Sequence, residues 1–239
     1  MLNKTLRDEI RSTAQEFWNA EVQTPEFAKL AAGKEIGHRI ADKVDEQTTQ
    51  LLRGKYPIFF EHGPKGQRAR SMGDFWLLSE GNYHPVNVKA GQENSNGQPN
   101  IVSLKKLLRA LLTRRIDSYY LLIVKFQIST AIRATVYFID ILDYIDCVTF
   151  NSGPGQMMLK EKQFYTVMRQ SPREPSLSLH QKREALVTML EDGEVSLIKN
   201  RAKTLDEIRS LWAEYLSGAE NGIEPAALNQ IQWNLHEPD

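Results

Sequence analysis

The sequence predicts an α/β fold in which helices flank a central mixed β-sheet. The first observation is a pair of apolar runs at residues 118–128 (SYYLLIVKFQI) and 131–142 (AIRATVYFIDIL), rich in β-branched and aromatic residues. Runs of this kind are typical of strands buried on both faces. The second observation is the order of elements, which reads strand, strand, helix, strand, strand. Helices that cover the faces of a sheet are the natural burial solution for that order.

Two helices are expected ahead of the sheet. Residues 1–18 form a charged amphipathic segment and do not resemble a signal peptide. Residues 28–52 place Ile36, Ile40, Val44 and Leu51 at roughly helical spacing. This segment is therefore predicted to be an amphipathic helix whose Ile36 packs on the sheet.

A β-hairpin is predicted next, with strands at residues 73–79 and 85–89 and a loop around residues 80–83. Side chains alternate between the faces of a strand, so Asn87 and Lys89 are expected on one face and Val88 on the other. Asp74 on the first strand would then converge with Lys89 on the second. Such a pair has the geometry needed to hold a divalent cation and an attacking water against a phosphodiester. An ordinary polar surface hairpin is the other interpretation.

The remaining segments alternate helices and breaks. Residues 101–115 are predicted to form a helix, with an apolar face made of Ile101, Leu104, Leu107, Leu108 and Leu111. A turn at residues 151–155 precedes a short amphipathic helix at 156–168, and a loop at 170–176 precedes helices at about 178–190 and 205–216. The 239 residues are expected to form one domain.

The hairpin motif resembles the catalytic core of the PD-(D/E)XK nucleases, the superfamily of most type II restriction endonucleases. Asp74 matches the first acid, although Gly73 precedes it in place of proline, and Asn87-Val88-Lys89 matches the second motif with Asn in place of an acid. A minority of restriction enzymes in this superfamily carry Asn or Gln there. The resemblance implies a restriction-endonuclease-like core at about residues 30–145. A helical elaboration at about residues 151–239 would then serve DNA recognition or dimerisation.

The resemblance also implies roles for these residues. Asp74 and the backbone carbonyl of Val88 would bind Mg²⁺, and Lys89 would orient or activate the nucleophile. Asn87 would hold a metal-bound water. Glu35, in the Gly-x-Glu context of residues 33–35, is the expected auxiliary acid, with Glu46 as the alternative.

The function implied is that of a type II restriction endonuclease, which hydrolyses double-stranded DNA to 5′-phosphate and 3′-hydroxyl ends. A structure-specific DNA repair or recombination nuclease remains an alternative, as does a catalytically inactive DNA-binding member of the fold. A homodimer is expected because palindromic sites favour two-fold symmetry. A cognate DNA methyltransferase is implied as a functional companion and not as a bound partner.

The charge is balanced in total and uneven along the chain. The net charge is zero, but basic residues gather in the loop at 63–71 and in the helix after the hairpin, while acidic residues predominate near the end. The loop lacks the ending of a phosphate-binding P-loop. Because it runs directly into Asp74 and carries cations, it is interpreted as a DNA-clamping loop in preference to a nucleotide site. The residues expected to contact DNA are Lys65, Arg68, Arg70, Gln92, Lys105, Lys106 and Arg173.

Several other classes of protein are excluded. The single cysteine, Cys147, rules out an internal disulfide framework and a cysteine-based zinc site, and the five histidines form no closely spaced metal pair. The chain has no Gly-x-Ser-x-Gly or Gly-x-Gly-x-x-Gly motif. No apolar run is long enough to span a bilayer, so a soluble, cytoplasmic protein is expected.

Overall fold

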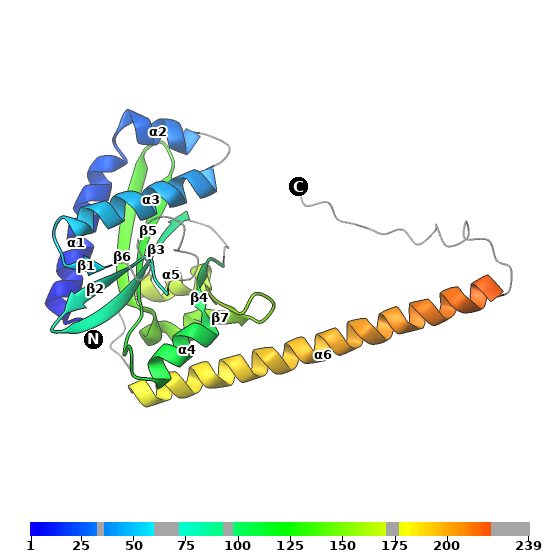
Figure 1. The fold of residues 1–239 in the computed structure, drawn as a ribbon. Helices are drawn as coiled ribbons and strands as arrows, with labels where there is room; N and C mark the ends of the chain where they lie inside the picture. Colours follow the sequence, from blue (N-terminus) through cyan, green and yellow to red (C-terminus); the bar gives the residue numbers. More distant parts are fainter. Residues whose placement is uncertain (33–35, 60–71, 93–97, 171–176, 221–239) are drawn as a thin grey trace. The chain divides into compact units, whose positions relative to one another are not determined.

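The computed structural model describes residues 1–32, 36–59, 72–92, 98–170 and 177–220 (Figure 1). The chain divides into two compact units, residues 1–193 and 194–239. The helices are α1 (Lys4–Glu21), α2 (Pro25–Ala32), α3 (Ile36–Arg53), α4 (Leu104–Leu112), the 3₁₀ segment η2 (Ile141–Cys147), α5 (Glu161–Gln170) and α6 (Leu179–Glu220). The strands are β1 (Ile58–Phe59), β2 (Phe75–Ser79), β3 (Asn82–Gln92), β4 (Asn100–Ser103), β5 (Tyr120–Ile128), β6 (Ile132–Asp140), β7 (Val148–Asn151) and β8 (Gln156–Leu159).

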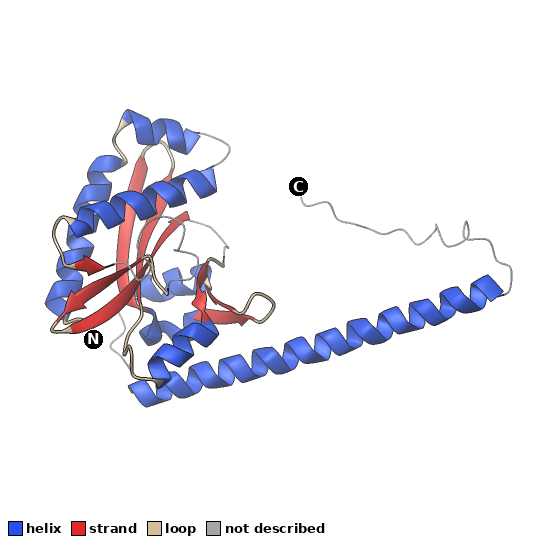
Figure 2. Cartoon of the chain, viewed as in Figure 1, coloured by secondary structure: helices blue, strands red, loops and turns tan. Residues whose placement is uncertain are grey.

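The central sheet has five strands in the order β1-β2-β3-β5-β6 (Figure 2). Strands β3 and β5 run parallel, while the pairs β1–β2, β2–β3 and β5–β6 are antiparallel. The sheet is therefore mixed, and the predicted α/β class with flanking helices is confirmed. A second sheet, with the order β4-β8-β7, was not predicted.

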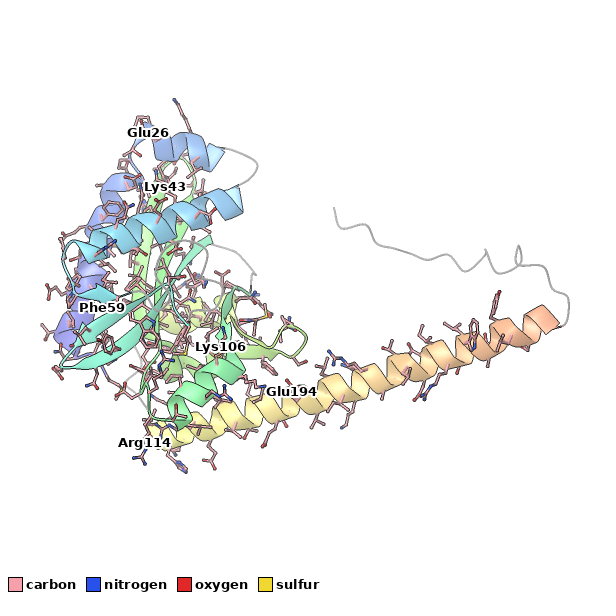
Figure 3. The ribbon with its side chains drawn as sticks, in the orientation of Figure 1. Glu26, Lys43, Phe59, Lys106, Arg114 and Glu194 are labelled. Carbon is pink, nitrogen blue, oxygen red and sulfur yellow. The ribbon has the colours of Figure 1, made fainter. Side chains whose placement is uncertain are left out.

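Each face of the central sheet has its own hydrophobic core. On one face α1, α2 and α3 cover alternate residues of β5. Trp18 packs edge-on against both Phe27 and Phe126, and the rings of Phe27 and Phe126 are tilted at 41° to each other. An ion pair at 2.6 Å between Lys43 of α3, labelled in Figure 3, and Glu21 of α1 joins two of these helices. On the other face α4, α5 and the first turns of α6 cover the intervening residues of β5. Burial on both faces explains why the sequence of β5 is apolar almost throughout.

The predicted hairpin is confirmed. Residues 75–79 of β2 pair antiparallel with residues 82–86 of β3, and the two-residue turn is Glu80-Gly81. Both turn residues have positive φ values, 51° and 76°, as a type I′ turn requires. Glycine reaches this conformation at no steric cost. Val88 lies in the core beneath α3 and Asn87 contacts the opposite core, so the predicted alternation also holds.

Two predicted helices begin too early in the sequence. Ile101 and Val102 belong to strand β4, and the helix begins only at Leu104. Residues 156–159 likewise form β8, and α5 begins at Glu161. The two strand segments pair with each other, antiparallel, through Val102 and Met157. A non-local pairing therefore overrides the local helical spacing in both places.

Two further helix boundaries differ from the prediction. The segment at residues 28–52 is divided into α2 and α3, and the helices expected at 178–190 and 205–216 are one continuous helix, α6. Gly193 lies inside α6, where a Cβ would come within 2.2 Å of the Phe150 ring. This glycine permits close packing against the β7–β8 hairpin and does not end the helix. Among the described residues, no helix is long and apolar enough to cross a membrane.

Candidate functional site

Asp74 lies at the point where β2 begins to pair with β3. Its backbone N–H donates to the carbonyl of Val86 at 2.8 Å, and the N–H of Val88 donates to its Oδ2 at 2.6 Å. The carboxylate is therefore held against the backbone of β3 beside residue 88. In the register of β2 and β3, Asp74 falls opposite Asn87.

Gly73 is required by this arrangement. An ideal Cβ at residue 73 would lie 2.6 Å from the carbonyl oxygen of Val86 and 3.1 Å from its nitrogen. Both are backbone atoms of β3, which cannot turn away as a side chain can. The close approach of the two strands thus explains why glycine precedes the acid in this chain.

Asn87 is buried and its amide has a fixed orientation. Its Nδ2 donates to the carbonyl of Ile101 at 2.8 Å and to the hydroxyl of Tyr119 at 3.3 Å. Because a carbonyl can only accept, the amide nitrogen must face Ile101. The remaining atom, Oδ1, is buried and has no hydrogen-bond partner among the described residues. A buried acceptor without a donor is uncommon, and it suits a water or a cation at this position.

Lys89 follows on the same face of β3. Burial lowers the pKa of its ammonium group, while negative charge on Asp74 and on Asp45 acts in the opposite direction. The charge of Asp74 therefore acts on Lys89, and the convergence of the two side chains on one point stays a prediction. The pairing of β2 with β3 ends at Phe75 and Val86, so among the described residues Lys89 has a paired strand, β5, on one side only.

Asp45 of α3 is a carboxylate that sequence reasoning missed. Helix α3 packs on the face of β3 that carries Val88, and Asp45 of this helix is half-buried and accepts a hydrogen bond from Thr49 Oγ1 at 3.4 Å. Its neighbour Glu46, the alternative auxiliary acid, is exposed. Glu35, the preferred auxiliary acid, lies outside the described residues. The helix predicted to supply an acid thus brings a different one, Asp45, within electrostatic reach of Lys89.

A second polar group lies farther along the same face. Gly91 is paired with Lys125 of β5, and a Cβ at residue 91 would meet the Tyr165 hydroxyl at 2.7 Å and Glu161 Oε1 at 3.0 Å. Lys125 is buried and its ammonium lies 4.0 Å from the centre of the Tyr165 ring. Burial and the charge of Glu161 raise the pKa of Tyr165. One sequence signal could have indicated this group, since Lys125 is the only charged residue in its apolar run.

The first turn of α4 is basic. Lys105 and Lys106 are exposed there, the turn holds no acidic residue, and the side chain of the N-cap residue Ser103 makes no capping hydrogen bond (Figure 3). The end of a helix where N–H groups are unsatisfied is already electropositive. This end of α4 follows directly on β4, whose Ile101 carbonyl holds Asn87. Lys105 and Lys106, two of the three lysines predicted to contact DNA, thus lie in the helix that follows the strand bonded to Asn87.

The other predicted contacts are less defined by the structure. Lys65, Arg68, Arg70 and Arg173 lie outside the described residues. Gln92 is the last residue of β3, and its side chain is not described.

The arrangement offers oxygen atoms suited to a hard divalent cation. Asp74 supplies a carboxylate, residue 88 a backbone carbonyl and Asn87 an unpartnered amide oxygen, which are the ligand types that Mg²⁺ accepts. The described residues contain no cluster of three His, Cys, Asp or Glu side chains that could hold a metal. Any cation here would therefore depend on neutral oxygens and water as well as on Asp74.

Comparisons with known proteins identify no family. No protein-family model matches this chain, and no curated protein matches its sequence. The geometry of the site is therefore the basis on which its function is inferred.

Proposed function

We propose that this chain is a divalent-metal-dependent DNA nuclease of the PD-(D/E)XK type, acting as a type II restriction endonuclease. The observation that carries the proposal is the group of polar atoms at the β2–β3 junction. The Asp74 carboxylate accepts a hydrogen bond from the N–H of Val88, and Asn87 presents a buried acceptor oxygen. The charge of Asp74 acts on the pKa of Lys89. The mixed sheet with helices on both faces is compatible with a restriction-endonuclease-like core.

Asp74 and the backbone carbonyl of Val88 would hold the metal, with Asn87 contributing directly or through water. Asp45 would take the place expected for Glu35 or Glu46, because its charge acts on Lys89. When bound, a divalent cation would polarise a non-bridging phosphate oxygen and lower the pKa of a water. Mg²⁺ is the expected ion because all these donors are oxygens.

The chain's own residues supply the rest of the chemistry. Lys89 would orient the attacking water and offset negative charge that develops on the phosphate. Burial lowers the pKa of Lys89, so less free energy is needed to remove its proton than for an exposed lysine. Asn87 would accept a hydrogen bond from the water through Oδ1, because Ile101 holds its amide nitrogen. Lys105 and Lys106 would contact phosphates beside the scissile bond.

The test is cleavage of unmethylated plasmid and phage DNA by the purified protein with Mg²⁺ or with EDTA. The proposal expects discrete fragments that disappear with EDTA and with Asp74→Ala. The matched control is Asp8→Ala, which removes an exposed carboxylate from α1 and should leave cleavage unchanged. Mg²⁺-dependent cutting by folded Asp74→Ala would refute the assignment. Cleavage of branched DNA in preference to plain duplex would indicate the repair or recombination alternative.

A catalytically inactive DNA-binding protein is the second candidate, favoured by the lack of a three-ligand cluster among the described residues. Intact DNA under Mg²⁺ and Mn²⁺, together with retained duplex binding, would support it. Binding itself can be assigned to α4. If both lysines contact phosphates, Lys105→Ala with Lys106→Ala should lower the slope of log affinity against log salt by about 2, since each contact contributes about 0.9.

A further inference from the structure

The part of α6 that begins at Glu194 carries large apolar side chains on its surface (Figure 3). Their exposed fractions lie between 44% and 65%, which is far above the value for a core residue. The residues are Val195, Ile198, Leu205, Ile208, Leu211, Trp212, Tyr215 and Leu216. Exposed apolar surface of this extent marks a binding surface.

These residues follow a seven-residue repeat. Ile198, Leu205 and Trp212 are seven residues apart, and Ile208 and Tyr215 stand three residues after the last two of them. The first set occupies the a positions of a heptad and the second the d positions, which form one stripe along a helix. The only described a or d residue between 198 and 215 that is not apolar is Arg201, at d. Val195, Leu211 and Leu216 widen the stripe at the adjacent e and g positions.

The charged residues of the segment form two blocks of opposite sign along its length. The first half carries Lys199, Arg201 and Lys203, with Glu194 as its one described acid. The second half carries Asp206, Glu207 and Glu214, with Arg209 as its one described base. Lys203 forms an ion pair with Glu207 at 3.7 Å on the face away from the stripe. Because the halves differ in sign, an antiparallel helix of the same sequence is electrostatically complementary to this one, and a parallel helix is not.

We propose that residues 194–217 of α6 form an antiparallel coiled-coil interface with the same segment of a second copy of this chain. In an antiparallel coiled coil, each residue at an a position packs against a residue at a d position of the partner helix, and this rule determines the contacts between the two copies. Ile198 packs on Tyr215 of the second copy, and Leu205 packs on Ile208 of the second copy. Both of these layers occur twice by symmetry.

Arg201 decides the orientation. In the antiparallel alignment Arg201 faces Trp212 of the second copy, where the guanidinium can stack on the indole face. In a parallel, in-register alignment Arg201 would face Arg201 of the second copy, and two cations would meet inside the stripe. The repeat spans residues 198–215, or roughly 25 Å of helix at 1.5 Å per residue. This inference concerns oligomerisation alone and does not rest on the proposed nuclease activity.

Sedimentation of the full chain tests the association. The proposal expects a dimer at about 10–100 μM, the range in which micromolar affinity populates the complex. Leu205→Asp should weaken dimerisation by more than about 100-fold, because it places two carboxylates in adjacent central layers. Ser210→Asp introduces the same charge on the opposite face and should leave the dimer unchanged. A monomer throughout the range, a trimer or tetramer, or a dimer insensitive to Leu205→Asp would overturn the proposal.

Disulfide trapping tests the orientation. A mixture of Ile198→Cys and Tyr215→Cys proteins should form a disulfide between the two variants, whereas either variant alone should not. The native Cys147 is fully buried and should not compete. Crosslinking of Ile198→Cys with itself would establish a parallel pair and overturn the antiparallel assignment. A circular dichroism spectrum matching the parent protein should accompany each variant, so that loss of helix is not mistaken for loss of the interface.

Discussion

Replacing Gly73 by alanine should destabilise the fold and displace Asp74. The added Cβ would lie 2.6 Å from the Val86 carbonyl oxygen, 3.1 Å from the Val86 nitrogen and 3.2 Å from the Phe75 oxygen. Overpacking against atoms that cannot rotate away costs about 1–3 kcal/mol. Alanine also restricts the unfolded chain more than glycine does, and this effect alone would stabilise the folded state by about 0.4–1 kcal/mol. From the middle of both ranges, the net destabilisation is expected to be about 1.3 kcal/mol.

Urea unfolding followed by circular dichroism measures this change, with Gly54→Ala as the matched control. A Cβ at Gly54 meets nothing nearer than 3.6 Å, so that variant should be neutral or slightly stabilised. Separation of β2 from β3 would also move Asp74 away from the Val88 N–H. Under the proposed nuclease function, DNA cleavage by the folded variant should then fall by more than about tenfold, because misplacement by about 1 Å can lower a rate about a hundredfold. A folded Gly73→Ala protein with unchanged stability would refute the steric reasoning.

Three further outcomes are expected. Asn87→Asp should lower the free energy of unfolding by about 1–3 kcal/mol in the absence of metal, because a carboxylate oxygen replaces the donor that faces the Ile101 carbonyl at 2.8 Å. Added Mg²⁺ should restore part of that stability, measured by thermal unfolding. Asp74→Asn removes a charge that raises the pKa of Lys89, so an NMR titration of the Lys89 side chain should give a lower pKa than in the parent. Burial raises the pKa of Asp140 to about 7. The folded state therefore binds the proton more tightly than the unfolded state, and the parent should lose stability relative to Asp140→Asn as pH rises from about 4 to 7. Parallel stability–pH curves for these two proteins would show that Asp140 does not titrate in this range.

The hairpin could be predicted because the features that specify it are local. Alternation along residues 85–89 assigns the two faces of β3, and Gly81 permits the tight turn that fixes its register with β2. Asp74, Asn87 and Lys89 lie within one such unit, so sequence alone was enough to assign them to the same hairpin. The alternation rule required no knowledge of the rest of the chain.

The strands β4 and β8 could not be predicted in the same way. Ile101 stands at helical spacing from Leu104, and the apolar stripe of α4 continues through it without a break. Its strand conformation comes from a partner strand more than fifty residues later in the chain, joined through Val102 and Met157. Strand formation depends on such partners more than helix formation does, so local spacing gave the wrong boundary.

Asp45 shows why the carboxylate of α3 whose charge acts on Lys89 was harder to identify than the hairpin residues. Helical spacing around Val44 correctly gives the buried side of α3, and successive residues of a helix are rotated by about 100°. Asp45 and Glu46 therefore leave the helix in different directions, and Glu46 is exposed while Asp45 is half-buried. Of the two, Asp45 is the residue whose charge raises the pKa of Lys89. That relation comes from tertiary packing, so the sequence could indicate a carboxylate on this helix without deciding which one acts on Lys89.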